Sequence, residues 1–333
     1  MMCSQPENYR FTSAWRRNLV SVVVSVAALG LLFYQIFPTD FGTEAKNIEI
    51  EVYSLPIGSL PIVPAVYSSV SGSAQAAIAD KPPRTLSSAA DSVPTGKLAL
   101  LMNLLLLERG QARLAEVADY TATFIKQERI GNEISQPQVM RLKIRHQPFS
   151  VYLKWLRGDK GREVIYIAGR NDGNLLVHVG GWKARLLPTV KLDPNGSLAM
   201  QESRHPLTDI GLLEVVRRSL GYRQRDLDAE SGVRCQMLDN QTFDDRDCYC
   251  FTTEYDDSSL SEGNRKTVVY LDKEMSLPVS VTNYGWPPAG EQFDPARLDE
   301  MTLIEAYSYS NIELDQQLTD IDFDRNNKKY RFR

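Results

Sequence analysis

Apolar and polar side chains alternate along much of the chain after residue 120. The clearest case is the segment 139–146, in which one parity is apolar and the other is basic. The two sets are Met140, Leu142 and Ile144, and Arg141, Lys143 and Arg145. A period of two residues is that of a β-strand with one face in a core and the other in water. The pattern therefore predicts a half-buried antiparallel strand in this segment.

Nine other segments alternate in this way or are continuously apolar over the length of a strand. They are 120–130, 149–156, 163–167, 175–179, 233–238, 248–255, 266–271, 277–284 and 301–312. Turn residues that tolerate positive φ separate most of the strands, including Gly131-Asn132 and Asn195-Gly196. These connections are local, so we predict a meander of about ten or eleven antiparallel strands and exclude a Rossmann or TIM-barrel design.

Two segments have the spacing of helices. The first runs from Lys97 to Tyr120, is rich in leucine and is apolar on most sides, so a large sheet is expected to cover it. The second begins after Thr208-Asp209 and ends near Gly221. The predicted fold class is α+β and mainly antiparallel β: a half-barrel sheet curved around one or two helices.

The N-terminal region carries the signal of a membrane anchor. The apolar stretch from Leu19 to Phe37 would span roughly 28 Å as a helix, which matches a bilayer core. Arg10, Arg16 and Arg17 precede it and acidic residues follow it, so the positive-inside rule predicts a cytoplasmic N-terminus. A cleaved signal peptide is the competing interpretation, but the stretch is long for one and no small-residue cleavage site follows.

The expected organisation has four parts. Residues 1–17 are a cytoplasmic tail, 18–38 a transmembrane signal anchor, 39–96 a linker rich in Pro, Ser and Ala, and 97–333 a folded domain. We therefore predict a single-pass protein of the inner (cytoplasmic) membrane. Its C-terminal domain is expected to be periplasmic or otherwise extracytoplasmic.

Composition and charge exclude several function classes. The chain has 333 residues and a net charge of −4, so it offers no basic surplus for binding nucleic acid. Its 4 Cys and 3 His form no CxxC or HExxH motif, and no GxSxG or phosphate-binding glycine loop occurs. We predict no metal, no cofactor and no catalytic residue. A hydrolase whose groups converge from distant positions is the remaining enzymatic alternative.

Eight short motifs follow one another along the C-terminal domain. They are YTATFIKQE from Tyr120, PFSVYLKW from Pro148, GREVIY from Gly161, HPLT from His205, YLDK from Tyr270, LPV from Leu277, YGWP from Tyr284 and LTDIDFD from Leu318. Their order resembles a bacterial family, domain of unknown function 1571, over about 100–333. That family in turn resembles the lipoprotein carriers of the LolA and LolB type. The carrier resemblance implies a half-barrel that encloses an apolar cavity for acyl chains.

The apolar parity of the predicted strands supplies the candidate lipid-binding residues. They are Tyr120, Phe124, Met140, Leu142, Ile144, Val151, Leu153 and Trp155. On the concave face of a half-barrel they would bind an acyl chain by burying apolar surface, at about 25 cal/mol per Å². Core packing without any ligand is the competing interpretation of the same residues.

Arg141, Lys143 and Arg145 form a predicted basic strip on the opposite parity. On the outer face of the sheet this strip would be ordinary solvated surface. At the mouth of a cavity it would meet lipid phosphates or a peptidoglycan carboxylate. The sequence leaves both interpretations open.

Three cysteines lie on two neighbouring predicted strands. In an oxidising compartment, a disulfide between Cys235 and either Cys250 or Cys248 is favoured. Cys248 and Cys250 share a face because they are two residues apart, and Cys250 suits a symmetrical hairpin better. Three reduced, buried thiols are the alternative.

The favoured function is binding, without catalysis. We predict a membrane-anchored exported protein that holds a lipid or a lipoprotein acyl chain on the concave face of its half-barrel. The alternative is an envelope scaffold or regulatory module, with a core filled by its own side chains and an envelope protein as partner.

Overall fold

The protein is described here by a computed structural model that covers residues 94–181, 187–288, 290 and 294–332. The predicted tail, membrane anchor and nearly all of the linker lie outside these residues, so they stay predictions. Within the described ranges, no helix is both long and apolar enough to cross a membrane. A compact unit spans Ala89–Arg333 and contains every core described below.

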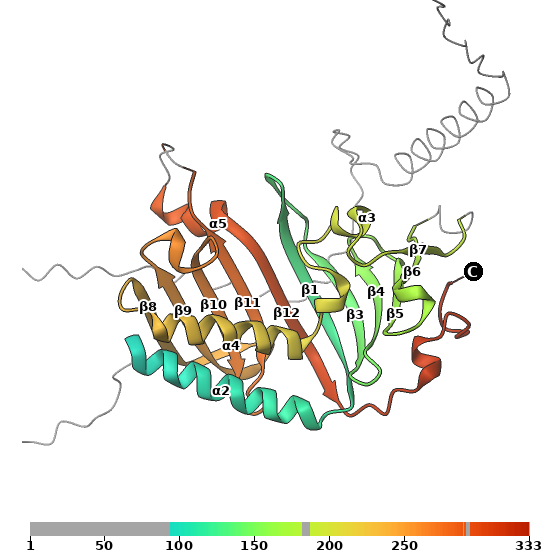
Figure 1. Cartoon of the computed structure of the whole chain (residues 1–333), viewed down its shortest axis with the longest axis horizontal. Helices are drawn as coiled ribbons and strands as arrows, with labels where there is room; N and C mark the ends of the chain where they lie inside the picture. Colours follow the sequence, from blue (N-terminus) through green and yellow to red (C-terminus); the bar gives the residue numbers. More distant parts are fainter. Residues whose placement is uncertain (1–93, 182–186, 289, 291–293, 333) are drawn as a thin grey trace, which may run out of the picture. The chain divides into compact units, whose positions relative to one another are not determined.

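Twelve strands form one open sheet (Figure 1). They are β1 (Asp119–Ile130), β2 (Glu133–Ile134), β3 (Gln138–Arg145), β4 (Ser150–Arg157), β5 (Glu163–Ile167), β6 (Leu175–His178), β7 (Val190–Leu192), β8 (Val233–Phe243), β9 (Arg246–Tyr255), β10 (Asn264–Asp272), β11 (Pro278–Gly285) and β12 (Leu303–Leu314). Their order is β7-β6-β5-β4-β3-β1-β12-β11-β10-β9-β8, and β2 pairs with β1 alone. Every pairing is antiparallel, which confirms the predicted antiparallel sheet.

The chain builds this sheet in two runs that start and finish at its centre. From β1 it meanders outward to the edge strand β7, and a helix then carries it across to the other edge, β8. It returns by hairpins to β12, which pairs with β1 so that Tyr120 lies opposite Leu314. The hairpins follow from local turn residues, whereas the β1–β12 pairing joins segments far apart in the sequence.

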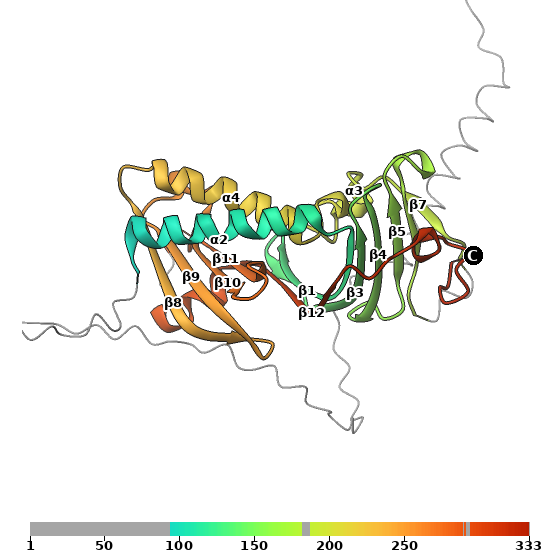
Figure 2. The ribbon, with the colours of Figure 1, turned by 90° about the horizontal axis from the view of Figure 1, so that it is seen from below.

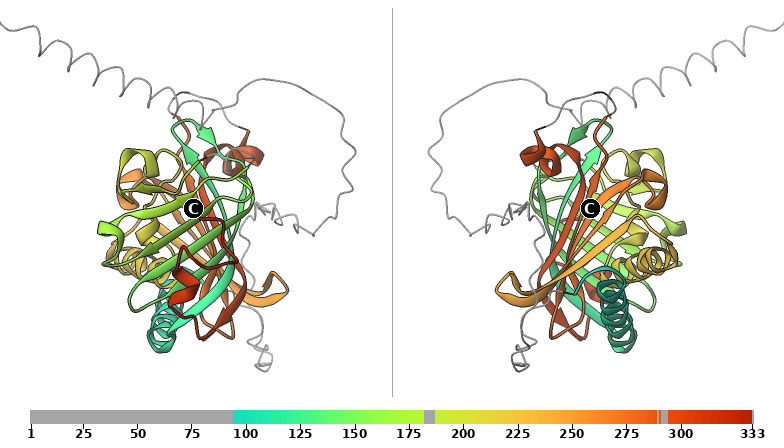
Figure 3. Two further views of the ribbon diagram at one scale, coloured as in Figure 1. Left: turned by 90° about the vertical axis from the view of Figure 1, so that its right-hand side faces the viewer. Right: turned by 90° about the vertical axis from the view of Figure 1, so that its left-hand side faces the viewer.

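Two long helices, α2 (Gly96–Glu116) and α4 (Leu212–Asp228), lie side by side on one face of the sheet (Figures 1 and 2). We call this the inner face, and the opposite one the outer face. The short helices are α3 (Ser197–Met200) and α5 (Leu298–Thr302), with 3-10 turns η1 (Asn171–Gly173), η3 (Leu207–Asp209), η4 (Ser258–Leu260), η5 (Pro295–Arg297) and η6 (Asp320–Phe323). Figure 3 shows both long helices on the same side of the sheet when it is viewed along its width.

Helix α2 packs closely against the β10–β11 connection at a glycine. A Cβ atom added to Gly110 would lie 2.1 Å from the carbonyl oxygen of Ser276, so any larger residue would push the helix away. The buried side of α2 is Ala99, Leu100, Asn103, Leu107, Gly110 and Leu114. The predicted sheet covers this helix, and α4 packs beside it, but Leu98, Leu101 and Leu105 remain exposed.

Three hydrophobic clusters hold the fold together. One combines the inner face of β1, β3 and β4 with the first turns of α4. A second packs the N-terminal half of α2 onto strands β8 to β10. The third lies on the outer face, where residues 318–332, which we call the C-terminal strap, cover Tyr152, Ile165 and Leu176. The rings of Tyr330 and Tyr152 stack there with centroids 4.1 Å apart.

The predicted elements differ from the observed ones mainly at their ends. Helix α4 continues past Gly221 to Asp228, because the packing of its later turns outweighs the modest cost of one glycine inside a helix. The short strands β2 and β7 were not predicted, since two or three residues carry no readable period. The sheet therefore has twelve strands rather than ten or eleven.

Candidate functional site

The eight candidate lipid-binding residues lie together on the inner face. Cross-strand pairing aligns them: Tyr120 lies opposite Ile144, and Ile144 lies opposite Val151. The same alternation brings Leu142 beside Leu153. The full set is Tyr120, Phe124, Met140, Leu142, Ile144, Val151, Leu153 and Trp155, all between 0% and 7% exposed. They form one continuous apolar surface, and side chains of the protein itself pack on it.

An apolar row crosses four strands within this surface. Tyr309 of β12, Phe124 of β1, Met140 of β3 and Trp155 of β4 follow one another as directly paired residues, and we call them the apolar row. The Phe124 ring stacks on Tyr309 with centroids 4.9 Å apart. Apolar contacts of this kind have no fixed direction, so the row can pack against any apolar partner.

The first turn of α4 covers the end of this surface at Tyr120. The backbone N–H of Leu212 donates a hydrogen bond to the Tyr120 hydroxyl at 2.8 Å. Gly211, just before the helix, has φ of 112°, and an added Cβ would lie 2.5 Å from Cδ1 of Ile144. Burial raises the pKa of Tyr120 well above its usual value, so the hydroxyl stays protonated. A glycine is needed here because the backbone lies directly on the sheet.

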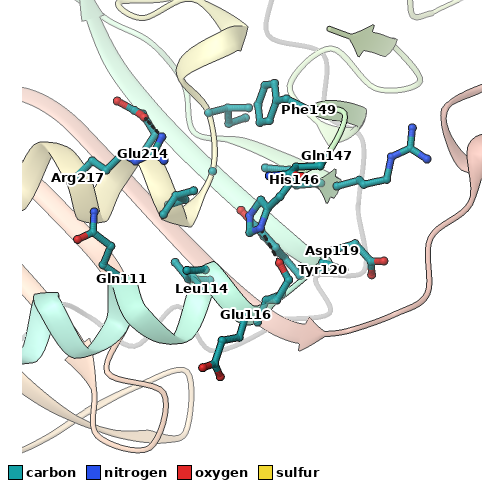
Figure 4. Close-up of a pocket in the computed structure, with 18 of the residues that line it drawn as sticks. Gln111, Leu114, Glu116, Asp119, Tyr120, His146, Gln147, Phe149, Glu214 and Arg217 are labelled. Atoms are coloured by element: carbon teal, nitrogen blue, oxygen red, sulfur yellow. Dashed lines mark hydrogen bonds and ion pairs between the residues drawn. The ribbon is translucent and has the colours of Figure 1, made fainter.

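A cavity of about 1010 Å³ opens beside this helix start. Its apolar wall includes Leu114, Ile144, Phe149, Ile210 and Leu213. Figure 4 shows three groups of side chains around it: Gln111, Leu114 and Glu116 from α2, Glu214 and Arg217 from α4, and His146, Gln147 and Phe149 from the β3–β4 connection. We call this the end pocket. Of the eight candidate residues, Tyr120 and Ile144 line it, and the other six lie in the core behind it.

Some polar side chains of the end pocket have partners, but the Oδ1 atom of Asp119, the Nε atom of Arg145 and the Nε2 atom of His146 are buried without a hydrogen-bond partner. Arg217 pairs with Glu214 at 3.6 Å. The Nδ1 atom of His146 lies 2.7 Å from the carbonyl oxygen of Val117, so it donates a hydrogen bond there and the ring is held in place. These contacts fix part of the rim, and the pocket presents both polar and apolar side chains to a ligand.

A second row on the inner face is polar. Thr253, Thr267, Asn283, Glu305 and Glu128 are paired one after another across β9, β10, β11, β12 and β1, and we call them the polar row. All five side chains are buried. On β1 it lies four residues from the apolar row, since Phe124 and Glu128 point to the same side.

Charged side chains from α4 and the loop before it satisfy the polar row. Glu305 accepts hydrogen bonds from Asn283 at 2.8 Å and Arg204 at 3.0 Å, and its Oε2 lies 3.1 Å from Nε2 of His205. On α4, the buried Arg223 donates to the hydroxyl of Thr253 at 2.9 Å.

Glu128 accepts hydrogen bonds from three neighbours. The ammonium group of Lys126 donates to it at 2.9 Å and the backbone N–H of Arg204 at 3.4 Å. The Tyr307 hydroxyl also donates to Glu128, and it lies 3.2 Å from Oε2 of Glu305. The contacts of Arg204 and His205 hold the loop before α4 on the sheet, and that of Arg223 holds a later turn of the helix.

The environment of Glu305 keeps it ionised. Burial raises the pKa of this carboxyl group, but the hydrogen bonds and charges of His205, Asn283 and Arg204 outweigh burial and hold the pKa at about 2. The pKa of Tyr307 is raised, first by burial and then by the charges of Glu305 and Glu128, so its hydroxyl remains a donor.

Sequence reasoning did not find the polar row. Its members are up to 177 positions apart in the sequence, from Glu128 to Glu305. The pairing of β1 with β12 places these two residues opposite each other. Two of the quoted motifs carried a signal: the first ends at Glu128 itself, and the fourth begins at His205, which contacts Glu305. Among the described residues, no group of three or more His, Cys, Asp or Glu side chains is placed to hold a metal ion.

The basic strip lies on the outer face, where the C-terminal strap covers it. Lys143 pairs with Asp322 at 2.7 Å, and Arg145 pairs with Asp320 at 2.8 Å. Arg141 is exposed to solvent. The interpretation of this strip as open solvated surface is therefore incomplete: two of its three cations anchor the strap. Arg145 also lines the end pocket, but its guanidinium is already bound to Asp320.

The predicted disulfide is absent: Cys235, Cys248 and Cys250 are free and buried in the described structure. Cys235 is paired with Thr253, three residues from Cys250, and the alternation of side chains places those two sulfur atoms on opposite faces. Cys248 shares the face of Cys250. Burial raises the pKa of Cys248 to about 11, so this thiol is protonated at neutral pH.

A known family matches residues 117–332 of this chain: DUF1571, described as a protein of unknown function. The match covers more than half of the 333 residues, so the chain belongs to this family, as the motif order indicated. No curated protein matches the chain.

Several solved structures are similar to this chain. A LolA superfamily protein from Nitrosomonas europaea has 14% identity and a TM-score of 0.25, with 66% of this chain and 96% of that chain covered. The lipoprotein LppX from Mycobacterium tuberculosis has 9% identity and a TM-score of 0.37, over 66% and 98% of the two chains. The MucA/MucB complex of Pseudomonas aeruginosa has 12% identity and a TM-score of 0.37, over 67% and 60%.

Proposed function

We propose that this protein is a membrane-anchored, exported protein that binds a lipid or the acyl chain of a lipoprotein between its sheet and its two long helices. The observation that carries the proposal is the end pocket, a cavity of about 1010 Å³ beside the apolar inner face. Sites for small molecules have volumes of about 300–1,000 Å³. The predicted anchor at residues 18–38 supplies the membrane attachment in this proposal.

The apolar wall of the end pocket is the expected seat of the acyl chain. Leu114 comes from α2, Ile144 from β3, and Leu213 from α4, so the chain would lie where three elements meet. Burial of an aliphatic chain needs no directed contacts and stabilises by about 0.8 kcal/mol per methylene group. The polar side chains around the pocket would then face the headgroup of the bound lipid.

Deeper binding requires α4 to move. Phe124, Leu142 and the other core residues are reached from the pocket only when the first turn of α4 leaves the sheet. That turn is held by apolar contacts and by the hydrogen bonds of Tyr120 to Leu212 and of Tyr309 to the Gly211 backbone. The later turns are fixed at Thr253 through Arg223. We therefore expect the helix start near Gly211 to be the part that yields to a ligand.

The alternative is an envelope scaffold without a ligand. The observation that favours it is the complete burial of Met140, Leu142 and Val151 by the protein's own side chains. In that case the inner face is simply a core, and the end pocket is a surface hollow.

Native mass spectrometry distinguishes the two functions. We would export the compact unit Ala89–Arg333 into a bacterial periplasm, purify it without detergent and identify any released molecule. The acyl-binding function predicts an added mass that dissociates as phospholipid or acylated peptide. A clean mass, together with refusal of added palmitate and phospholipid, would support the scaffold and overturn our proposal.

Two matched variants locate the ligand. Leu213→Glu places a carboxylate on the apolar wall of the end pocket and should abolish the added mass, because a charge next to an acyl chain is costly. Leu198→Glu makes the same change at a leucine of α3 that is 43% exposed and does not line the pocket. It should leave the added mass unchanged.

A further inference from the structure

Three buried polar atoms of the end pocket have no hydrogen-bond partner among the described residues. They are Oδ1 of Asp119, Nε of Arg145 and Nε2 of His146, and all three residues line the pocket. Asp119 lies directly opposite Arg145 on β1 and β3, and the backbone N–H of His146 donates to the carbonyl oxygen of Ala118 at 2.9 Å. The three residues are therefore neighbours, and we call them the polar corner. Figure 4 shows Asp119 and His146 beside Tyr120.

Other atoms of the same side chains have partners, which defines what the polar corner still lacks. Asp119 is 4% exposed, and its Oδ2 accepts a hydrogen bond from the backbone N–H of Leu318 at 2.9 Å. Arg145 donates through Nη1 to Asp320 at 2.8 Å and through Nη2 to Ser150 at 3.0 Å. The remaining carboxylate oxygen and Nε–H are buried and unpaired, which is costly unless a further group pairs with them.

The ring of His146 adds a second acceptor. Its Nδ1 lies 2.7 Å from the carbonyl oxygen of Val117, and a carbonyl oxygen only accepts, so Nδ1 carries the hydrogen. In the neutral ring, Nε2 is then an acceptor. The polar corner therefore offers two unpaired acceptors, on Asp119 and His146, and one unpaired donor, on Arg145.

Among carboxylate, ammonium and hydroxyl headgroups, only hydroxyls match this set. A hydroxyl both donates and accepts, whereas a carboxylate offers acceptors alone and an ammonium group donors alone. Side chains alternate along a strand, so Asp119 and Arg145 point to the outer side while the His146 ring lies against the inward Tyr120, with centroids 5.9 Å apart. Adjacent hydroxyls can reach both sides.

The charges around the pocket disfavour an anionic group in the polar corner. The carboxylate side chains among the lining residues are Glu108, Glu116, Asp119 and Glu214. The guanidinium groups of the described lining are those of Arg145 and Arg217, and each is already paired, with Asp320 and Glu214 respectively. A carboxylate or phosphate placed here would therefore meet Asp119 and a cation that is already neutralised.

We infer that the end pocket holds a lipid whose headgroup ends in vicinal hydroxyls, as a glycerol or a sugar does, with these hydroxyls in the polar corner and the acyl chain on the apolar wall. This inference rests on the proposed acyl-binding function and names the headgroup class that the function leaves open. Glycerol and sugar share the chemistry of adjacent hydroxyls, and a probe of each kind distinguishes the two sources.

Titration calorimetry with probes of one chain length tests the headgroup preference. The compact unit Ala89–Arg333 would be titrated at neutral pH with monolauroylglycerol, dodecyl glucoside, laurate and dodecylamine, each below its micelle concentration. At least one of the two polyol probes should bind about tenfold more tightly than laurate and dodecylamine do, and the tighter one identifies glycerol or sugar. Equal binding of all four, or tighter binding of laurate or dodecylamine, would overturn the inference.

A change in the probe tests the donors without altering the protein. The dimethyl ether of monolauroylglycerol keeps the oxygen acceptors and loses both O–H donors. It should bind about tenfold more weakly than monolauroylglycerol, because Asp119 and His146 then stay unpaired. Equal affinities would contradict the assigned pairing.

A matched pair of variants tests the protein side. In Asp119→Asn the backbone N–H of Leu318 keeps an oxygen as its partner, so the amide nitrogen takes the place of Oδ1 and an acceptor becomes a donor. The affinity ratio of monolauroylglycerol to laurate should fall about tenfold. Asp315→Asn removes the same charge at an exposed residue that does not line the pocket, and its ratio should equal that of the wild type. An unchanged ratio in Asp119→Asn would overturn the inference.

The outcome is separable from that of the proposed function. If no lauroyl or dodecyl probe binds, acyl binding is wrong and the headgroup inference is wrong with it. If all the probes bind without preference, acyl binding is supported and the headgroup inference alone is wrong.

Discussion

The apolar row and the polar row cross the same inner face, four residues apart on β1, and they hold the helices in different ways. The apolar row, from Tyr309 to Trp155, contacts its cover through non-directional packing. The polar row, from Thr253 to Glu128, requires specific donors at specific distances. Directed contacts fix one part of α4, while apolar contacts leave the other part able to exchange one apolar partner for another. A ligand site is therefore expected at the apolar end.

The largest expected effect is at the polar row. Glu305→Ala should lower the free energy of unfolding by about 3–5 kcal/mol, because it leaves the charges and donors of Arg204, His205 and Asn283 without their acceptor. Urea denaturation followed by circular dichroism measures this loss. Glu313→Ala, at an exposed carboxylate on the same strand, is the matched control and should change stability by less than about 0.5 kcal/mol. If Glu305→Ala lowers the free energy of unfolding no more than Glu313→Ala does, the directed contacts of Glu305 do not stabilise the fold.

Acid should weaken the same row. The pKa of Glu305 is about 2 in the folded protein against 4.5 for an ordinary glutamate, so the ionised side chain stabilises the fold above pH 4.5. This contribution, on the order of 3 kcal/mol, is lost as the pH falls from about 4.5 toward 2. Stability measured at several pH values should fall less steeply in Glu305→Gln over that range. Parallel curves for the two proteins would show that Glu305 is not the titrating group.

At the apolar end, Gly211→Ala should destabilise by about 1–3 kcal/mol. The new methyl group would lie 2.5 Å from Cδ1 of Ile144 and 2.8 Å from the Tyr120 hydroxyl, at a φ of 112°. Gly221→Ala is the control within the same helix, where an added Cβ meets nothing within 4 Å, and it should stabilise by up to about 1 kcal/mol. Thermal unfolding of both variants tests the close approach of the helix start. Equal effects would mean that α4 does not lie against the sheet at Gly211.

The smallest expected change in stability gives the most direct test of whether the two parts of α4 are held differently. Tyr120→Phe removes one of the hydrogen bonds that hold the start of α4 on the sheet, another being that between Tyr309 and the Gly211 backbone, and it should cost about 1 kcal/mol. Tyr222→Phe, which removes an exposed hydroxyl contact to Glu262, should cost almost nothing. If the start of α4 is the part that yields, hydrogen exchange of the Leu212 amide should quicken in Tyr120→Phe while the later turns stay protected. Uniform quickening along α4 would show that the helix moves as one unit.

Much of the fold could be read from local patterns. The alternation in 139–146 gave a strand and its two faces, and the turn residues separated the hairpins correctly. The inward parity of Met140, Leu142 and Ile144 then placed these residues on one surface, as the pairing with β4 shows. Such predictions succeed because period, turn chemistry and burial all depend on residues close together in the chain.

The predictions that failed depend on contacts between distant segments. The disulfide required a hairpin centred midway between Cys235 and Cys250, but β8 and β9 are joined at Asp244-Asp245, and the resulting register pairs Cys235 with Thr253. The basic strip met Asp320 and Asp322, which lie more than 170 positions away in the strap. The exposed leucines of α2 were expected to be covered because they are apolar. Periodicity shows how apolar one side of a helix is, but it does not show whether another element packs there.

The sequence by itself determined the antiparallel strands, the two long helices, the apolar parity of the inner face and membership of the DUF1571 family. Only the tertiary structure decided that β12 returns to β1, that the polar row forms between Glu128 and Glu305, and that the end pocket lies where α2, α4 and the β3–β4 connection meet. The physical reason is that secondary structure is selected by interactions within a few residues. A pocket, in contrast, is the space left between segments whose docking is fixed only by the packing of the whole domain.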